Sequence, residues 1–128
     1  MNLIIDTHIF LWYISADNRL RKKYVEVISD MNNEVYLSVA SVWECIIKSQ
    51  LGKLILPDKP SKYIPEKRQL HQVLPLEIDE DAFTYLEELP AIHKDPFDRI
   101  IISQALQHNM KLITEDNQIK RYNLPIFI

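Results

Sequence analysis

Glycine and cysteine are almost absent from this sequence, with one residue of each. A chain with the single glycine Gly52 cannot carry the GxGxxG or GxxxxGK loops that cradle phosphates in dinucleotide-binding and P-loop proteins. A chain with the single cysteine Cys45 forms no internal disulfide, which fits a reducing cytoplasm. Because apolar residues of an expected helix surround Cys45, we predict a buried and unreactive thiol there.

Long apolar runs and an excess of positive charge are also missing. No stretch approaches the roughly 20 apolar residues of a membrane span, and the first residues lack the basic lead and cleavage site of a signal peptide. The formal net charge of −3 argues against a protein that holds nucleic acid on a broad basic face. A metal-dependent nuclease stays compatible with this charge, because bound cations reverse the local field.

The pattern of apolar residues predicts one α/β domain over residues 1–128. Short apolar runs predict buried strands at 3–5, 35–37, 76–78, 110–114 and 126–128. Helical periodicity predicts helices at 7–15 (capped by Thr7), 18–31, 39–51, 61–72, 79–89 and 96–108, with a short turn or helix at 117–122. Strands that alternate with helices indicate a parallel sheet covered on both faces.

Four acidic residues fall at the ends of predicted strands or the starts of predicted helices: Asp6, Glu44, Asp98 and Asp116. In a parallel α/β sheet, such positions gather at one edge. We therefore expect these carboxylates to meet in one pocket although they are far apart in the sequence. Carboxylates that meet need a cation, and hard divalent cations with oxygen ligands promote phosphodiester cleavage.

Each of these acidic residues also has a purely structural interpretation. Asp6 and Asp116 suit helix caps or turns, and Asp98 falls in a first helical turn, where the helix dipole favours negative charge. Glu44 could complete a capping box with Ser41, but apolar residues before Ser41 indicate that this helix starts earlier. A carboxylate at the border of an apolar stripe then needs a partner, and a metal would serve.

Three basic residues near the carboxylates are candidates for phosphate contacts: Lys48, Lys94 and Arg99. Lys48 also stands four residues after Glu44, where the two side chains form a favourable helical pair. Asp95 precedes a proline at an expected helix start, so we predict that it caps the helix rather than acts in the site.

Two histidines flank the acidic motifs. We expect His8 to be packed or hydrogen-bonded, and we regard His93 as a candidate for phosphate contact. No spacing of histidines in the chain resembles a zinc site.

Two other classes of protein place an acidic residue after a first strand. An aspartate-nucleophile phosphatase requires a second aspartate two residues later, where this chain has His8. A receiver-like domain that binds Mg²⁺ requires a lysine at a late strand end, whereas Lys111 begins its predicted strand. Hydrolysis of RNA separates a nuclease from a binding domain, and turnover of phosphorylated small molecules would favour a phosphatase.

Four segments carry motifs in a recognisable order: Asp6 to Trp12, Ser38 to Glu44 with Lys48 and Leu51 to Leu54, His93 to Arg99 with Gln104-Ala105, and Leu112 to Asp116. Together they resemble the PIN domain and, more narrowly, the VapC-type toxins of bacterial type II toxin–antitoxin systems. The resemblance covers the whole chain, and the run Asp95-Pro-Phe-Asp-Arg99 is its most specific part.

This resemblance implies a three-layer α/β/α sandwich with a central parallel sheet and an Mg²⁺- or Mn²⁺-dependent endoribonuclease. Asp6 and Asp98 would be primary metal ligands, and Glu44 and Asp116 would hold a second cation or position the attacking water. Thr114 would support the last acidic residue and, like Lys48 and Arg99, is a candidate for contact with the substrate. The alternative is a catalytically silent PIN-like or receiver-like Mg²⁺-binding domain.

The resemblance also implies partners. They are an RNA substrate, a second copy of the chain in a homodimer, and a cognate antitoxin that inhibits the enzyme. DNA would be contacted only through the antitoxin. We expect the antitoxin to lay an amphipathic helix in a groove, with a basic side chain reaching the carboxylates.

Overall fold

The computed structural model describes residues 1–128 and has a four-stranded sheet in the order β3-β2-β1-β4. All three strand pairs are parallel. The strands are β1 (Asn2–Ile5), β2 (Glu34–Ser38), β3 (Leu74–Leu76) and β4 (Lys111–Ile113). The helices are α1 (Thr7–Ile14), α2 (Lys22–Ser29), α3 (Val39–Gln50), α4 (Pro60–Leu70), α5 (Asp81–Glu88), α6 (Pro96–Gln107) and α7 (Asn117–Lys120). None of these helices has both the length and the apolar composition needed to cross a bilayer.

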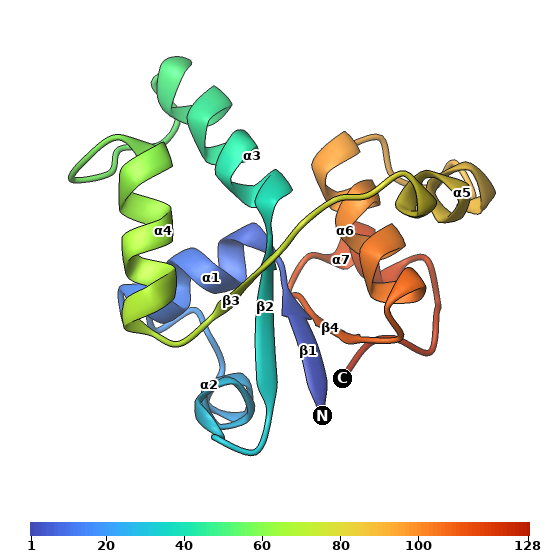
Figure 1. Ribbon diagram of the computed structural model, residues 1–128, viewed down its shortest axis with the longest axis horizontal. Helices are drawn as coiled ribbons and strands as arrows, with labels where there is room; N and C mark the ends of the chain where they lie inside the picture. Colours follow the sequence, from blue (N-terminus) through green and yellow to red (C-terminus); the bar gives the residue numbers. More distant parts are fainter.

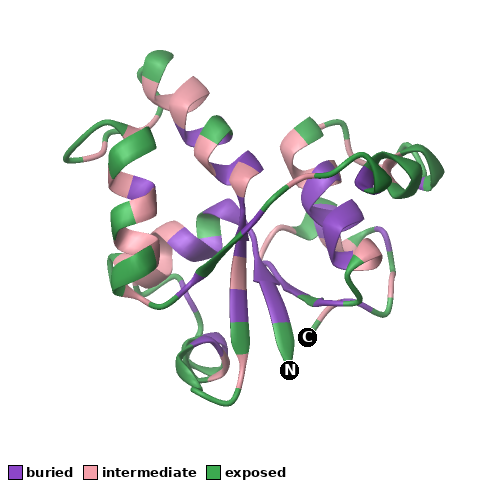
Figure 2. Ribbon diagram, viewed as in Figure 1, coloured by how far each residue is buried: buried purple, intermediate pink, exposed green.

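Helices cover both faces of the sheet, with α1 to α4 on one side and α5 to α7 on the other (Figure 1). The central strand β1 contributes to both cores: Leu3 and Ile5 pack with residues of α1, α2 and α4, whereas Ile4 packs with residues of α6 and α7. Figure 2 shows α6 buried along much of its length, while α5 at the edge of the molecule is mostly exposed. A strand buried on both faces has no polar alternation, which explains its continuous apolar run. The predicted three-layer α/β/α fold is confirmed.

Several predicted elements have different boundaries in the structure. The helix predicted at 18–31 begins only at Lys22, because Asp17 accepts a hydrogen bond from the backbone N–H of Arg19 at 2.9 Å and closes a turn first. The strand predicted at 76–78 lies at Leu74–Leu76. The strand predicted at 126–128 is wrong, since that segment forms only an isolated bridge between Phe127 and Leu112.

The carboxyl ends of β1, β2 and β4 lie side by side, and each leads into a helix with a side-chain cap. Oδ1 of Asp6 accepts from the N–H of Ile9 at 2.8 Å and caps α1. Ser38 caps α3 and Asp116 caps α7 in the same way. The prediction that Thr7 caps α1 is wrong, because Asp6 takes that role and the Thr7 hydroxyl bonds elsewhere. Three strand ends and three capped helix starts therefore meet at one edge of the sheet.

Cys45 lies on the buried face of α3, as predicted, with 1% of its surface exposed. Burial, with a smaller effect from the charge of Glu44, raises the pKa of its thiol to about 11. Because the thiolate is the reactive form, we expect iodoacetamide at pH 8 to alkylate the folded chain about a hundredfold more slowly than the chain unfolded in guanidinium chloride. Mass spectrometry of timed samples measures both rates. Comparable rates would show that α3 opens readily or that the thiol is accessible.

Candidate functional site

Asp6 is buried at the end of β1, and both of its carboxylate oxygens are engaged. Oδ1 caps α1, and Oδ2 accepts a short hydrogen bond from the hydroxyl of Thr114. Burial raises the pKa of Asp6 to about 6, although the hydrogen bonds from Thr114 and Ile9 lower it. The Thr114 hydroxyl also accepts from the backbone N–H of Asp116 at 3.0 Å. One hydroxyl thus ties the end of β1 to the turn after β4.

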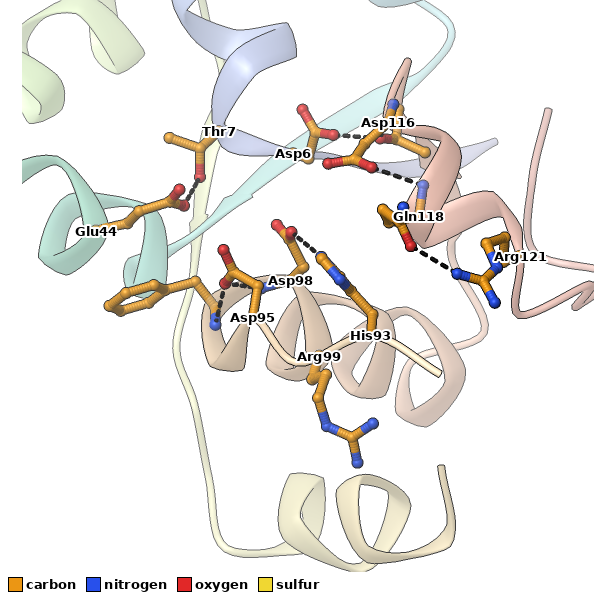
Figure 3. A network of polar contacts seen from close by, with 12 residues as sticks. Asp6, Thr7, Glu44, His93, Asp95, Asp98, Arg99, Asp116, Gln118 and Arg121 are labelled. Carbon is orange, nitrogen blue, oxygen red and sulfur yellow. Dashed lines mark hydrogen bonds and ion pairs between the residues drawn. The ribbon is translucent and has the colours of Figure 1, made fainter. Parts of the chain in front are cut away.

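Asp98, Asp116 and His93 form a compact group next to Asp6, with Asp98 and His93 below it in the view of Figure 3. One potential ligand atom from each of the three side chains lies within 4.8 Å of the others. His93 Nε2 is 2.7 Å from Oδ2 of Asp98. These side chains come from three places: the loop before α6, the first turn of α6 and the turn after β4. His93 and Asp98 are close in the sequence, and the tertiary fold brings Asp116 to them.

Asp98 carries the largest electrostatic perturbation in the group. Burial raises its pKa to about 7 against the lowering effect of the hydrogen bond with His93, and the negative charges of Asp95, Glu44 and Asp6 raise it further. The prediction that Asp95 caps α6 is confirmed, since it accepts from the N–H of Phe97 at 2.8 Å and of Asp98 at 3.1 Å. Several carboxylates that compete for one region favour a cation between them.

Glu44 does not belong to the group of His93, Asp98 and Asp116 and instead contacts Thr7, the residue after Asp6. It is buried on α3 with 2% of its surface exposed. Its Oε1 accepts from the Thr7 hydroxyl at 2.6 Å, and its Oε2 pairs with Nζ of Lys48 at 2.6 Å. Because α3 begins at Val39, the capping box with Ser41 is excluded. The partner that we expected a metal to provide is Lys48 in this structure.

Arg99 points away from the carboxylates (Figure 3). Its Nη1 donates to the hydroxyl of Tyr122 at 2.8 Å and to the carbonyl of Pro90 at 2.9 Å, and Nη2 donates to the carbonyl of Leu86 at 3.4 Å. The structure therefore does not support the predicted phosphate contact by Arg99, because its guanidinium ties the end of α5 and the following loop to α6. Lys94 is exposed next to His93, so it stays a candidate for the predicted phosphate contact.

Two contacts in the site are not predicted from the sequence. The first is the hydrogen bond from Thr7 to Glu44, which a threonine directly after a buried strand-end acid could have indicated. The second is the contact of His93, a predicted phosphate ligand, with Asp98, although both residues stand in one short motif. His8, expected to be packed or hydrogen-bonded, is exposed, with its ring centroid 6.1 Å from that of Trp12.

The donor set fits a hard divalent cation. Carboxylate oxygens suit Mg²⁺ and Mn²⁺, and neither Oδ1 of Asp98 nor Oδ2 of Asp116 takes part in a hydrogen bond within the chain. Two ligands at about 2.1 Å from one cation lie at most about 4.2 Å apart. Because the group spans 4.8 Å, small side-chain rotations suffice to close it around an ion.

Comparisons with known proteins agree with this architecture. Residues 3–124 match the family model described as the PIN domain. Ribonuclease VapC16 of Mycobacterium tuberculosis (strain ATCC 25618 / H37Rv) is 36% identical over 53 residues, which are 41% of this chain and 38% of that protein. The match thus spans well under half of the curated relative.

Two solved structures have the same fold over nearly the whole chain. VapBC2 from Rickettsia felis, bound to a DNA fragment from their promoter, aligns with a TM-score of 0.73 and 18% identity over 100% of this chain and 98% of that one. VapBC-1 from nontypeable Haemophilus influenzae aligns with a TM-score of 0.68 and 21% identity over 96% and 92% of the two chains.

Proposed function

This chain belongs to the PIN domain family, and from that premise we propose that it is a metal-dependent endoribonuclease, the toxin component of a type II toxin–antitoxin pair. The observation that carries the proposal is the group of Asp98, Asp116 and His93 beside Asp6 at the carboxyl edge of the sheet. The local match to a ribonuclease and the fold shared with VapBC complexes support the assignment as a toxin.

Asp6, Asp98 and Asp116 would hold Mg²⁺ or Mn²⁺ at this edge. When bound, such a cation supplies positive charge that activates a water molecule and stabilises the leaving oxygen of a phosphodiester. Asp6 is held in place for this role by the N–H of Ile9 and the hydroxyl of Thr114.

Two further side chains would act around this metal site. Each oxygen of Glu44 has one partner, Thr7 or Lys48, and a carboxylate oxygen can accept a second one. We therefore assign Glu44 to a second cation or to the attacking water, with its charge shared between that role and Lys48. Lys94, exposed beside His93, is a candidate to bind the RNA phosphate.

An antitoxin helix is the proposed occupant of a cavity beside the site. The cavity has a volume of about 650 Å³ and is lined by Leu11 and Trp12 of α1, Lys48 of α3, and Leu54 and Leu56 of the next loop, among others. Half of its lining residues are hydrophobic, which suits the apolar face of an amphipathic helix. Lys48 lines the cavity and also pairs with Glu44. An antitoxin helix bound in the cavity would therefore lie close to the Glu44 carboxylate. Homodimerisation, and DNA contact only through the antitoxin, remain predictions.

Cleavage of a structured RNA pool by purified wild type and Asp98→Asn tests the nuclease. We expect the wild type to cut with Mg²⁺ or Mn²⁺ and not with EDTA. Since a catalytic metal contributes several kcal/mol, the variant should cut at least about a hundredfold more slowly. Asp81→Asn is the matched control, because Asp81 also lies in a first helical turn but is exposed on α5.

Other outcomes of the same assay have definite meanings. Equal cutting by wild type and Asp98→Asn would indicate a contaminant or a misplaced site. If neither protein cuts RNA while calorimetry shows that the wild type binds the metal, the chain is a catalytically silent PIN-like domain. Cutting that persists in EDTA would contradict metal dependence.

A further inference from the structure

His93 is held in place by two residues that do not touch the carboxylates. The hydroxyl of Tyr122, whose side chain is buried, accepts from the backbone N–H of His93 at 3.1 Å and from Nη1 of Arg99 at 2.8 Å. Arg99 also binds the carbonyl of Pro90 at 2.9 Å. The loop that carries His93 is therefore fixed at two points, and its imidazole is directed at Asp98 (Figure 3).

The position of the imidazole is that of a ligand rather than of a surface side chain. The side chains of His93 and Asp98 are only 17% and 13% exposed, and a ring nitrogen of His93 belongs to the group of potential ligand atoms within 4.8 Å. Carboxylate oxygens alone suit Mg²⁺, whereas an imidazole nitrogen favours first-row transition metals. A donor set of two carboxylates and one imidazole is thus biased away from Mg²⁺.

We propose that His93 is a nitrogen ligand of the metal held by Asp98 and Asp116, so that the site prefers Mn²⁺ to Mg²⁺, and that Arg99 and Tyr122 are positioning residues for this imidazole. The proposal needs a cation at the carboxylates, as the proposed function does, but it needs no RNA cleavage. The 2.7 Å contact between Nε2 and Oδ2 of Asp98 contains one proton. Ligation of a cation by both residues would require the release of this proton to solvent, with the remaining imidazole proton on Nδ1 and the Nε2 lone pair available to the metal.

Mn²⁺ binding without RNA tests this inference. Titration followed by electron paramagnetic resonance gives the Mn²⁺ affinity, and electron spin echo modulation detects a nitrogen bonded directly to Mn²⁺. We expect the wild type to show the nitrogen signal. His93→Ala should lose the signal and bind Mn²⁺ at least about tenfold more weakly, while its Mg²⁺ affinity, measured by calorimetry, changes less.

Matched variants separate ligation from general damage to the fold. His108→Ala removes an exposed histidine at the end of α6 and should retain both signal and affinity. His93→Asn keeps a polar side chain on the loop and should lose the nitrogen signal while its melting temperature stays near that of the wild type. Tyr122→Phe frees the loop and should weaken Mn²⁺ binding in the same direction as His93→Ala, with a smaller loss.

The contrary results are equally definite. A nitrogen signal that persists in His93→Ala, or Mn²⁺ affinity that is unchanged or tighter, would show that His93 only shields Asp98 in the metal-free chain. Absence of the nitrogen signal from the Mn²⁺-loaded wild type would overturn the proposal in the same way. Because these measurements contain no RNA, His93 can fail as a ligand while the nuclease stands, and the reverse.

Discussion

Free of metal above neutral pH, the Asp98→Asn variant is expected to be more stable than the wild type. Burial and neighbouring negative charges raise the pKa of Asp98 from 3.8 to about 7. Between these two values the folded state keeps a proton that the unfolded state has lost, so the free energy of unfolding decreases as the pH rises towards 7. A pKa difference of about three units between the folded and unfolded states lowers the free energy of unfolding by at most ~4 kcal/mol. Asparagine carries no charge to bury, and we expect it to add roughly 2 kcal/mol at pH 8.

Thermal melts in EDTA at pH 5 and pH 8 measure this effect, with Asp81→Asn as the exposed control. The wild type should lose stability between the two values, and Asp98→Asn should lose less. We expect the stability of Asp98→Asn still to decrease somewhat between pH 5 and pH 8, because the raised pKa of Asp6 has the same effect on the free energy of unfolding. With saturating Mn²⁺, the wild type should have the higher melting temperature of the two proteins, because the metal stabilises the folded state that binds it. A lower melting temperature for metal-free Asp98→Asn at pH 8 would contradict the crowding of carboxylates.

Removal of the ammonium group beside Glu44 is expected to destabilise the fold strongly. Glu44 is 2% exposed, and Lys48 contributes its only ion pair. In Lys48→Met the Glu44 carboxylate stays buried without a compensating charge, which lowers the free energy of unfolding by roughly 3 kcal/mol. The double variant Glu44→Gln with Lys48→Met removes the stranded charge as well, and we expect it to recover most of this loss.

Urea denaturation of the single and double variants completes this comparison. Lys22→Met is the matched control, because Lys22 and Glu26 have the same i,i+4 spacing but lie 3.9 Å apart on the surface. This exposed pair should contribute less than about 0.5 kcal/mol. If Lys48→Met and Lys22→Met destabilise the fold equally, or if the double variant recovers nothing, the buried charge of Glu44 is not what Lys48 compensates.

The layers of the fold and the meeting of the strand ends follow from the sequence pattern. The run Leu3 to Ile5 has no polar alternation, which predicts a central strand covered on both faces, and the same logic placed Asp6 and Asp116 at neighbouring strand ends. The direction of Arg99 could not be predicted in this way. It depends on how α5 packs beside α6, and no local pattern encodes that contact.

Asp6 and Asp116 both cap helices, and these caps do not exclude the proposed metal role. A carboxylate has two oxygens, and in both residues Oδ1 caps a helix. Sequence patterns treat the two roles as alternatives because they assign one role to each residue. At Glu44 the pattern was ambiguous in another way, since Lys48 at i+4 and a metal are equally suitable partners for a buried carboxylate.

The contact between Asp6 and Thr114 joins residues 108 positions apart. During synthesis a chain grows by about 5 to 20 residues per second. Asp6 is therefore synthesised roughly 5 to 20 s before Thr114, whose hydroxyl donates to its carboxylate. The strand β1 cannot pair with β4 until a similar time has passed. Asp98 and Asp116 also belong to the last third of the chain. The group of side chains around them therefore cannot form until Asp116 has been synthesised and has left the ribosome.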